Sequence, residues 1–199
     1  IIIIRFNMAT ISIVLPTKNS EKYISKTLDS VQAQNFLDWE LLVCDSKSSD
    51  NTLKIINERI KKDNRIKIVS NFDHGVSDAL NIGFKSASGK IYAWLNSDDF
   101  YSSDTVLELV KKNLLDQNNF DYFVGDFFNV DEDGNKFKSF ISYIPKEKVV
   151  NHFFYNQIFT GSLFFTSKSY KDFGGFNLKY KYAFEYDLLF YLIKNYYGK

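Results

Sequence analysis

The sequence alternates between apolar runs of strand character and segments whose apolar residues recur at helical spacing. The helical spacing is illustrated by Ile24, Leu28 and Val31, which would share one face of a helix. The strand-like runs occupy residues 10–15, 39–44, 65–69 and 91–95. Because strands that alternate with helices form parallel sheets covered on both faces, the pattern predicts an α/β fold with a mostly parallel central sheet.

Polar residues follow three of these strands. Thr17 and Asn19 come after the first strand, Asp45 ends the second, and Asp98 and Asp99 follow the fourth. Ligands of open parallel sheets bind outside the carboxyl ends of the strands. We therefore expect these side chains to meet at one edge of the sheet, where they would form a binding site.

The adjacent carboxylates of Asp98 and Asp99 favour a bound cation. Two like charges side by side repel each other unless something positive shares them, and a divalent cation such as Mn²⁺ or Mg²⁺ prefers oxygen ligands. The alternative is a solvated turn before a helix that Ser103 or Asp104 caps. Taken alone, the pair does not decide between these two hypotheses.

Composition limits the class of protein. A chain of 199 residues with 45% hydrophobic residues is long enough to form one globular domain with a sizeable core. A net charge of +1 without a long basic run argues against a nucleic-acid partner. The lone Cys44 excludes an internal disulfide framework, and we expect it to be a small core residue in a reducing, cytoplasmic protein.

Two features concern the way the chain packs. Ala79, Gly83 and Ala87 form a stripe of small residues that would let a helix lie close to the sheet. After residue 119 the pattern changes to strand-like runs at 120–130 and 136–143, separated by an Asp-Gly hairpin signal. The second half is therefore expected to be more irregular and antiparallel.

Four segments, in this order, resemble a known family. They are ISIVLPTKNSEKYISKTLDSVQAQ, LLVCDSKSSDNT, HGVSDALNIGFKSASGKIYAWLNSDD and DFGGFNLKYKYAFEYDLLFYL. Over nearly its whole length the chain is similar to family 2 glycosyltransferases of the GT-A fold. The resemblance implies one GT-A domain over 1–199, with a Rossmann-like nucleotide-sugar-binding half (10–100) and a smaller acceptor-binding half (101–199).

The resemblance also implies a function. It is the transfer of a sugar, with inversion, from a nucleotide-sugar such as a UDP-sugar to a hydroxyl of a saccharide or lipid-linked acceptor, in cell-surface polysaccharide synthesis. Asp99, with Asp98, would hold the cation. Glu185 or Asp187 would be the catalytic base, because Glu185-Tyr186-Asp187 stands where relatives have a diacidic motif. For Glu185, stabilisation of a helix N-terminus is the alternative.

The remaining site residues belong to two groups. The nucleotide-binding group is Pro16, Thr17, Glu21, Asp45, Asp78 and Asp98, and the acceptor or sugar-binding group is Trp94, Gln157 and Ser162. For Asp45, whose carboxylate would accept a hydrogen bond from a pyrimidine, turn formation is the alternative, and for Asp78 it is a solvated helix start. Peripheral contact with the inner face of a membrane and a homodimer are left open.

Two other functions compete with glycosyl transfer. A nucleotidyltransferase would normally carry a glycine-rich phosphate loop after the first strand, and the segment PTKNSEKY contains no glycine. A non-catalytic nucleotide-sugar-binding module would differ only in lacking turnover. Replacement of both Glu185 and Asp187 by alanine separates that module from an enzyme.

Overall fold

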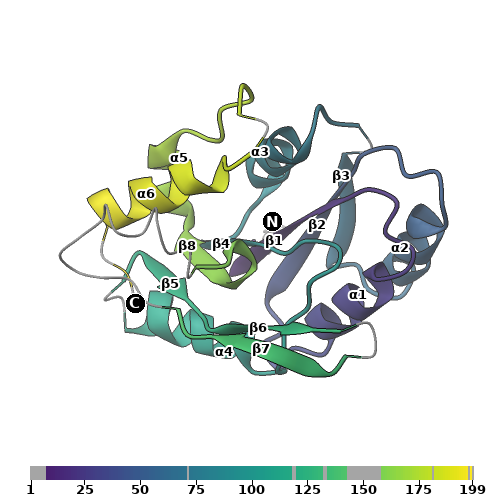
Figure 1. The fold of residues 1–199 in the computed structure, drawn as a ribbon, viewed down its shortest axis with the longest axis horizontal. Helices are drawn as coiled ribbons and strands as arrows, with labels where there is room; N and C mark the ends of the chain where they lie inside the picture. Colours follow the sequence, from purple (N-terminus) through teal and green to yellow (C-terminus); the bar gives the residue numbers. More distant parts are fainter. Residues whose placement is uncertain are drawn as a thin grey trace, which may run out of the picture.

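A six-stranded sheet forms the centre of the molecule, with the strand order β3-β2-β1-β4-β8-β5 (Figure 1). The computed structural model describes residues 8–70, 72–117, 120–131, 134–142, 158–180, 182–196 and 198. The strands of the sheet are β1 (Ile11–Thr17), β2 (Trp39–Asp45), β3 (Ile66–Ser70), β4 (Ile91–Trp94), β5 (Tyr122–Val124) and β8 (Leu163–Thr166). β1 to β4 are parallel to one another, while β8 runs antiparallel to both β4 and β5. The prediction of a mostly parallel α/β sheet is confirmed.

Helices cover both faces of this sheet (Figure 1). They are α1 (Ile24–Gln32), α2 (Thr52–Ile60), α3 (Val76–Ser86), α4 (Val106–Lys111), α5 (Ser167–Phe173) and α6 (Glu185–Asn195). A π-helical segment (Lys112–Asp116) continues α4, and a 3₁₀ turn (Thr160–Ser162) precedes β8. Buried side chains of α1, α2 and α4 pack on one face, and those of α3, α5 and α6 pack on the other. None of the helices in the described part of the chain is long and apolar enough to cross a bilayer.

The first strand is longer than the sequence predicts. The predicted strand ends at residue 15, before Pro16, but β1 continues to Thr17, with Pro16 opposite Cys44 and Thr17 opposite Asp45. β4 ends at Trp94, opposite Val14, so no neighbouring strand needs an N–H from Pro16 on that side. The extension places Thr17 at the carboxyl edge of the sheet beside Asp45.

Gly83 lets α3 lie directly against the sheet, as the stripe of small residues predicts. A Cβ at this position would lie 2.3 Å from Cγ1 of Val14 and 3.2 Å from Sγ of Cys44. No side chain larger than hydrogen fits without movement of β1. This close approach holds the C-terminal half of α3 against β1 and β2.

The expected strand over 120–130 is divided into two. β5 ends at Val124 and joins the main sheet, whereas β6 (Phe127–Val130) pairs with β7 (Lys136–Phe140) in a separate antiparallel ribbon. Gly125 and Asp126 make the break, and N–H of Gly125 donates to the carbonyl of Ser162 (2.9 Å). The ribbon therefore lies beside the main sheet and does not extend it.

Candidate active site

The loops after β1 and β4 are joined at the carboxyl edge of the sheet. The hydroxyls of Ser20 and Ser97 share a hydrogen bond of 2.6 Å, and Thr27 Oγ1 donates to the carbonyl of Ser97 (3.0 Å). Since Ser97 directly precedes Asp98 and Asp99, these contacts fix the aspartate turn against α1. The expected meeting of the loops after β1 and β4 is thereby confirmed, and their role in binding stays a prediction.

Three non-glycine residues adopt a left-handed backbone in the segments that carry the predicted site. They are Asn19 after β1 (φ 49°), Lys47 after β2 (φ 54°) and Ala183 before α6 (φ 57°). This conformation is uncommon for residues with a side chain and persists where the surroundings enforce it. Hydrogen bonds do so at Asn19, whose Oδ1 accepts from N–H of Ser49 (2.8 Å).

Asp99 is a partly buried carboxyl group with an elevated pKa. Burial raises its pKa to about 6, a hydrogen bond from Asn96 opposes the rise, and the charge of Asp98 adds to it. Asn96 Nδ2 donates to Asp99 Oδ2 over 2.9 Å. Helix α4 begins at Val106 with Thr105 as its N-cap residue and no side-chain cap hydrogen bond, so neither Ser103 nor Asp104 caps it as the alternative expects.

Asp98 and Asp99 could hold a cation only together with groups from a bound molecule or water. In the described part of the chain, no three His, Cys, Asp or Glu side chains gather as a metal site. The protein thus supplies two carboxylates, and further ligands would have to come from a substrate or water. Such an oxygen set suits Mg²⁺ or Mn²⁺, and a cation here would offset the repulsion that raises the pKa of Asp99.

The carboxylates in and between the loops after β1 and β2 are largely used to build these loops. Asp45 is fully buried and accepts from N–H of Ser48 (2.9 Å) and from its hydroxyl. Glu21 Oε2 accepts from N–H of Asn51 (2.9 Å) and from its side-chain amide (2.8 Å). Asp50 accepts from N–H of Thr52, the first residue of α2 (3.0 Å). Nucleotide contacts of Asp45 and Glu21 stay predictions.

Four buried side-chain polar atoms lack a hydrogen-bond partner among the described residues; Nε1 of Trp39 and the hydroxyl of Tyr101 are two of them, and the other two lie at or shortly after the ends of the parallel strands. These other two are Oγ1 of Thr17, which is 5% exposed, and Oδ2 of Asp73, which is 8% exposed. Oδ1 of Asp73 accepts from N–H of Gly75 (2.9 Å). An unpaired buried polar atom costs free energy, so its presence points to a group that pairs with it when bound. Asp73 was missed in the sequence, although it comes three residues after the end of β3, much as Asp45 stands at the end of β2.

Asp73 and Asp78 both lie near the end of β2. Burial raises the pKa of the Cys44 thiol to about 12, and the charges of these two carboxylates add to the rise. Cys44 is fully buried, so the prediction of a core residue is confirmed. Asp78 Oδ2 accepts from N–H of His74 (3.0 Å) at the start of α3, and its contact with a nucleotide stays a prediction.

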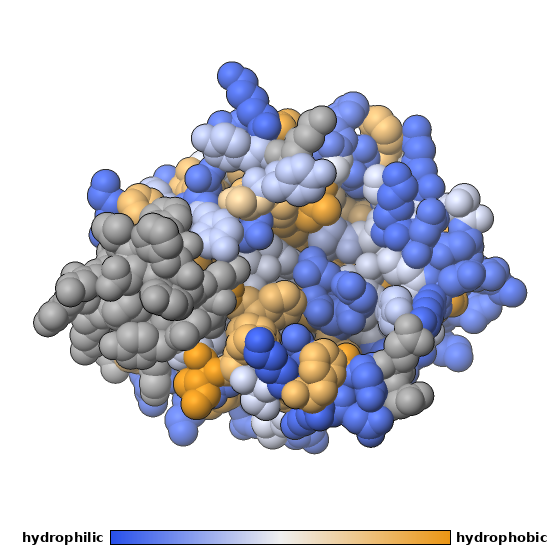
Figure 2. Space-filling view, in the orientation of Figure 1, coloured by the Kyte–Doolittle hydropathy of each residue, from blue (hydrophilic) through white to orange (hydrophobic). Residues whose placement is uncertain are grey.

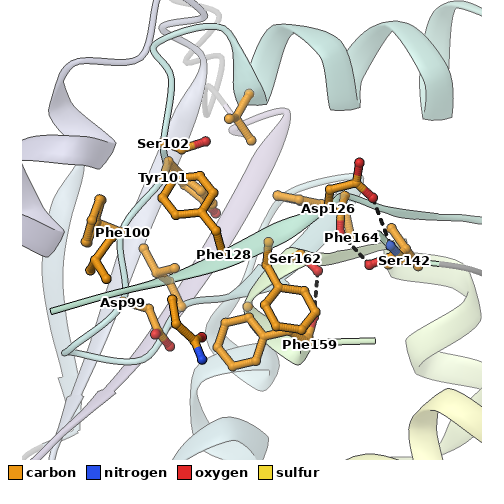
Figure 3. Close-up of a pocket in the computed structure, with 18 of the residues that line it drawn as sticks. Asp99, Phe100, Tyr101, Ser102, Asp126, Phe128, Ser142, Phe159, Ser162 and Phe164 are labelled. Atoms are coloured by element: carbon orange, nitrogen blue, oxygen red, sulfur yellow. Dashed lines mark hydrogen bonds between the residues drawn. The ribbon is translucent and has the colours of Figure 1, made fainter. Parts of the chain in front are cut away.

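A cavity of about 770 Å³ extends from the aspartate turn towards the β6–β7 ribbon. Figure 3 shows Asp99 and Phe100 at one end and Asp126 with Ser142 at the other. Ser162 also lines the cavity, and its hydroxyl donates to the carbonyl of Phe159 (2.8 Å). The structure therefore brings three predicted site residues, Asp98, Asp99 and Ser162, to one space, whereas Gln157 lies outside the described residues.

Trp94 is a core residue that links β4 to the start of α6. Its side chain is 3% exposed and lies against Phe176 (ring centroids 5.6 Å apart) and Phe184 (6.3 Å). Contact with a sugar requires an accessible ring, so this predicted role is not supported. Phe184 directly precedes Glu185, the first residue of α6. Glu185 and Asp187 are thereby held near the end of β4, but neither is among the described residues that line the cavity.

Asn81 is a second residue that the sequence did not reveal as important. Its amide donates to the carbonyl of Phe176 (2.9 Å), and its Oδ1 accepts from N–H of Phe176 (2.8 Å) and from the hydroxyl of Tyr170 (2.9 Å). These bonds attach the Gly174-Gly175-Phe176 turn to α3. Gly175 (φ 94°) brings the backbone so close that a Cβ there would lie 3.0 Å from Asn81 Oδ1.

The fold is that of GT-A glycosyltransferases. TarS of S. aureus in complex with UDP-GlcNAc superimposes with a TM-score of 0.72 and 24% identity, over 96% of this chain and 58% of that one. A mannosyltransferase of Pyrobaculum calidifontis in complex with GDP-Man and Mn²⁺ superimposes with a TM-score of 0.70 and 19% identity, over 96% and 54% of the two chains. The GT-A expectation is confirmed.

Residues 12–176 match the family described as Glycosyl transferase family 2, and the chain belongs to this family. The chain is also similar to WfgD of Escherichia coli, named as a UDP-Glc:α-D-GlcNAc-diphosphoundecaprenol β-1,3-glucosyltransferase, with 39% identity over 118 residues. That alignment covers 59% of this chain and 45% of WfgD. A chondroitin synthase of Pasteurella multocida is 29% identical over 89% of this chain and 18% of its own length. The match therefore spans a little under half the length of WfgD and less than a fifth of the length of the chondroitin synthase.

Proposed function

We propose that the protein is an inverting glycosyltransferase. It would move a sugar from a nucleoside-diphosphate sugar, specifically a UDP-sugar, to a hydroxyl of a saccharide or lipid-linked acceptor in cell-surface polysaccharide synthesis. Family membership and the printed activities of WfgD and the synthases support this proposal. The observation that carries it is a set of polar groups at the ends of parallel strands, namely Thr17, Asp73 and Asp99.

In this proposal the first half of the chain (10–100) binds the donor. Oγ1 of Thr17 and Oδ2 of Asp73 are buried without partners and would form hydrogen bonds to the nucleoside. Pro16, Glu21, Asp45 and Asp78 shape the surrounding loops. This arrangement would select the donor, because a donor with matching groups forms hydrogen bonds to the unpaired atoms of Thr17 and Asp73. A ligand without such groups leaves these atoms buried and unpaired, which costs free energy.

Asp99, with Asp98, would hold a divalent cation together with diphosphate oxygens of the donor. When bound, the cation supplies Lewis-acid stabilisation of the negative charge on the leaving nucleoside diphosphate. The chain's own part is to keep Asp99 ionised and fixed in position by the hydrogen bond from Asn96. The complex of the mannosyltransferase with Mn²⁺ supports a cation in this fold.

Glu185, with Asp187 as the second candidate, would accept the proton of the attacking acceptor hydroxyl. A hydroxyl is a weak nucleophile, so removal of its proton as the bond forms lowers the barrier. Both carboxylates lie in the first turn of α6, which the Trp94–Phe184 contact holds beside β4. The second half (101–199), including Ser162 and Gln157, would bind the acceptor. The protein would act in the cytoplasm, at the inner face of the membrane.

A donor-binding screen tests this proposal. Thermal shifts would be measured with UDP-, GDP- and dTDP-sugars, each with and without Mn²⁺, because a ligand that binds only the folded state raises the melting temperature. We expect a shift for UDP-sugars that needs the cation and is lost in Asp99→Asn. Equal shifts in the variant, or none with any donor, would contradict the proposal. Binding without turnover on any acceptor would favour a non-catalytic module.

A further inference from the structure

The cavity beside Asp99 is polar at one end and aromatic along most of its length. Asp98 and Asp99 lie at the polar end. Phenylalanine rings are the most frequent side chains in the remainder, and they include those of Phe123 and Phe127. Figure 3 shows the rings of Phe128, Phe159 and Phe164 there, and that of Phe100 beside Asp99. A cavity of about 770 Å³ is within the range of small-molecule sites, and its lining favours a ligand with a substantial apolar part.

Two serines deeper in the cavity are engaged with the protein itself, whereas the hydroxyl of Tyr101, which also lines the cavity, has no hydrogen-bond partner among the described residues. Ser142 donates through its hydroxyl to the carbonyl of Gly125 (2.8 Å) and through its N–H to Asp126 Oδ1 (2.8 Å). The hydroxyl of Ser162 donates to the carbonyl of Phe159 (2.8 Å). A site that holds a saccharide along its whole length would present converging free donors and acceptors. These bonds leave this part of the cavity better suited to an apolar chain than to sugar hydroxyls.

The apolar lining continues to the surface. Leu109 and Phe137 both line the cavity, and they are 51% and 67% exposed. Figure 2 shows apolar side chains interspersed with hydrophilic ones over the β6–β7 ribbon. A single exposed apolar residue is unremarkable, but two at the mouth of an apolar cavity extend its surface outward. Leu109 and Phe137 thus extend the apolar lining of the cavity to exposed surface.

Positive charge lies beside two of the lining rings. The ammonium group of Lys26 is 4.1 Å from the ring centroid of Phe100, and that of Lys136 is 3.7 Å from the centroid of Phe128. Asp98, Asp99 and Asp126 are the carboxylates that face the cavity from the described residues. Neither lysine lines the cavity, so the charge inside it is that of Asp98 and Asp99 at one end and of Asp126 at the other. A ligand whose polar head lies near Asp99 and whose apolar part lies along the rings fits this pattern.

We infer that this cavity binds the apolar aglycone of the acceptor, an alkyl or prenyl chain attached to the saccharide that receives the sugar. The inference rests on the proposed glycosyl transfer and selects the lipid-linked acceptor over a free saccharide. The saccharide lies at the Asp99 end, the chain lies along the phenylalanine rings, and it leaves past Leu109 and Phe137. Burial of each methylene group of the chain adds to affinity in this arrangement.

Calorimetry with two matched glycosides tests the inference. Methyl β-glucoside and octyl β-glucoside carry the same saccharide and differ in their chains, and octyl β-glucoside is used below its critical micelle concentration. We expect the octyl compound to bind at least about tenfold more tightly. Phe128→Ser and Phe137→Ser should each remove most of that difference. Leu37→Ser is the matched control, because Leu37 is 65% exposed and does not line the cavity.

The outcomes separate the cavity from the catalytic proposal. Equal affinity for the two glucosides, or an octyl preference that survives both phenylalanine substitutions, would overturn the inference. The same two glucosides then serve as acceptors with the donor found by thermal shift, and the octyl compound should show the lower KM. Preferential octyl binding without any transfer would contradict the proposed function and leave the cavity assignment standing. Transfer to both glucosides with the same KM would support the proposed function and contradict the cavity assignment.

Discussion

The indole ring of Trp94 packs against the phenyl ring of Phe184, with their centroids 6.3 Å apart. Trp94 ends β4, four residues before Asp98, and Phe184 directly precedes Glu185. Phe176 contacts both rings, at 5.6 and 5.4 Å. This aromatic cluster joins the strand that carries the proposed cation ligands to the helix that carries the proposed base.

Loss of the Phe184 ring should therefore impair catalysis more than donor binding. In Phe184→Ala the start of α6 loses its contact with β4, and we expect kcat to fall about tenfold or more while donor affinity stays within about twofold. Steady-state kinetics and donor calorimetry measure the two effects. Phe190→Ala, which removes a 39% exposed ring from the same helix, is the control. An unchanged kcat in Phe184→Ala would show that the cluster does not position the base.

Thr17→Val and Asp73→Asn should weaken donor binding without destabilising the fold. Oγ1 of Thr17 has no partner in the described structure, so a methyl group in its place costs no internal hydrogen bond. Asp73→Asn retains an oxygen to accept from Gly75 but loses the charge. Each change should lower the affinity for a UDP-sugar about five- to tenfold in calorimetry, with an unchanged urea midpoint. Wild-type affinity in both variants would remove these residues from the donor site.

Asp99→Asn should stabilise the ligand-free protein at neutral pH. The pKa of Asp99 is about 6 in the folded protein and about 3.8 in the unfolded chain, so the folded state holds this proton more tightly. Ionisation therefore lowers the free energy of unfolding as pH rises from about 4 to 6. In urea unfolding with EDTA, the variant should gain about 1 kcal/mol at pH 7.5 and nothing at pH 4.

The exposed Asp116 provides the control for that measurement. It forms a surface ion pair with Lys111, and its side chain is 49% exposed. Asp116→Asn should change stability by less than about 0.5 kcal/mol at either pH. A gain for Asp99→Asn that is equal at pH 4 and pH 7.5 would exclude ionisation of Asp99 as its cause.

Gly83→Ala should destabilise the protein by about 1–3 kcal/mol. Its new methyl group would lie 2.3 Å from a methyl group of Val14, and the strain exceeds the gain of about 1 kcal/mol in helix propensity. Chemical unfolding measures the change. The exposed Ser86 on the same helix serves as the control, because Ser86→Ala should alter stability by less than about 0.5 kcal/mol. Wild-type stability in Gly83→Ala would mean that α3 does not need this close contact.

Local pattern predicts the parallel part of the fold because each strand and helix carries its own periodicity. It fails at residues 120–130, where a continuous aromatic run is divided between two sheets at Gly125 and Asp126. Strand pairing depends on partners distant in the sequence, such as β8, which no local signal specifies. Pro16 was similarly misjudged, because its tolerance in β1 depends on where β4 ends.

The site shows the same division between local and long-range information. Asp98 and Asp99 stand out because two carboxylates follow an apolar strand. Asp73 could have been found by the same rule, since it lies shortly after β3. The role of Asn81 could not, because its partners are Phe176 and Tyr170, about 90 residues away. Trp94 was wrongly expected to contact a sugar, because its burial against Phe184 depends on tertiary packing that no local pattern indicates.

Anomeric configuration of the product tests the central proposal most directly. The wild-type protein would be incubated with the UDP-sugar and cation found by thermal shift and with octyl β-glucoside, and the new linkage would be examined by NMR. We predict a product whose anomeric configuration is inverted relative to the donor, and at least about a hundredfold less product with Glu185→Gln or Asp99→Asn. Retention of configuration, or wild-type amounts of product from both variants, would contradict the proposed mechanism.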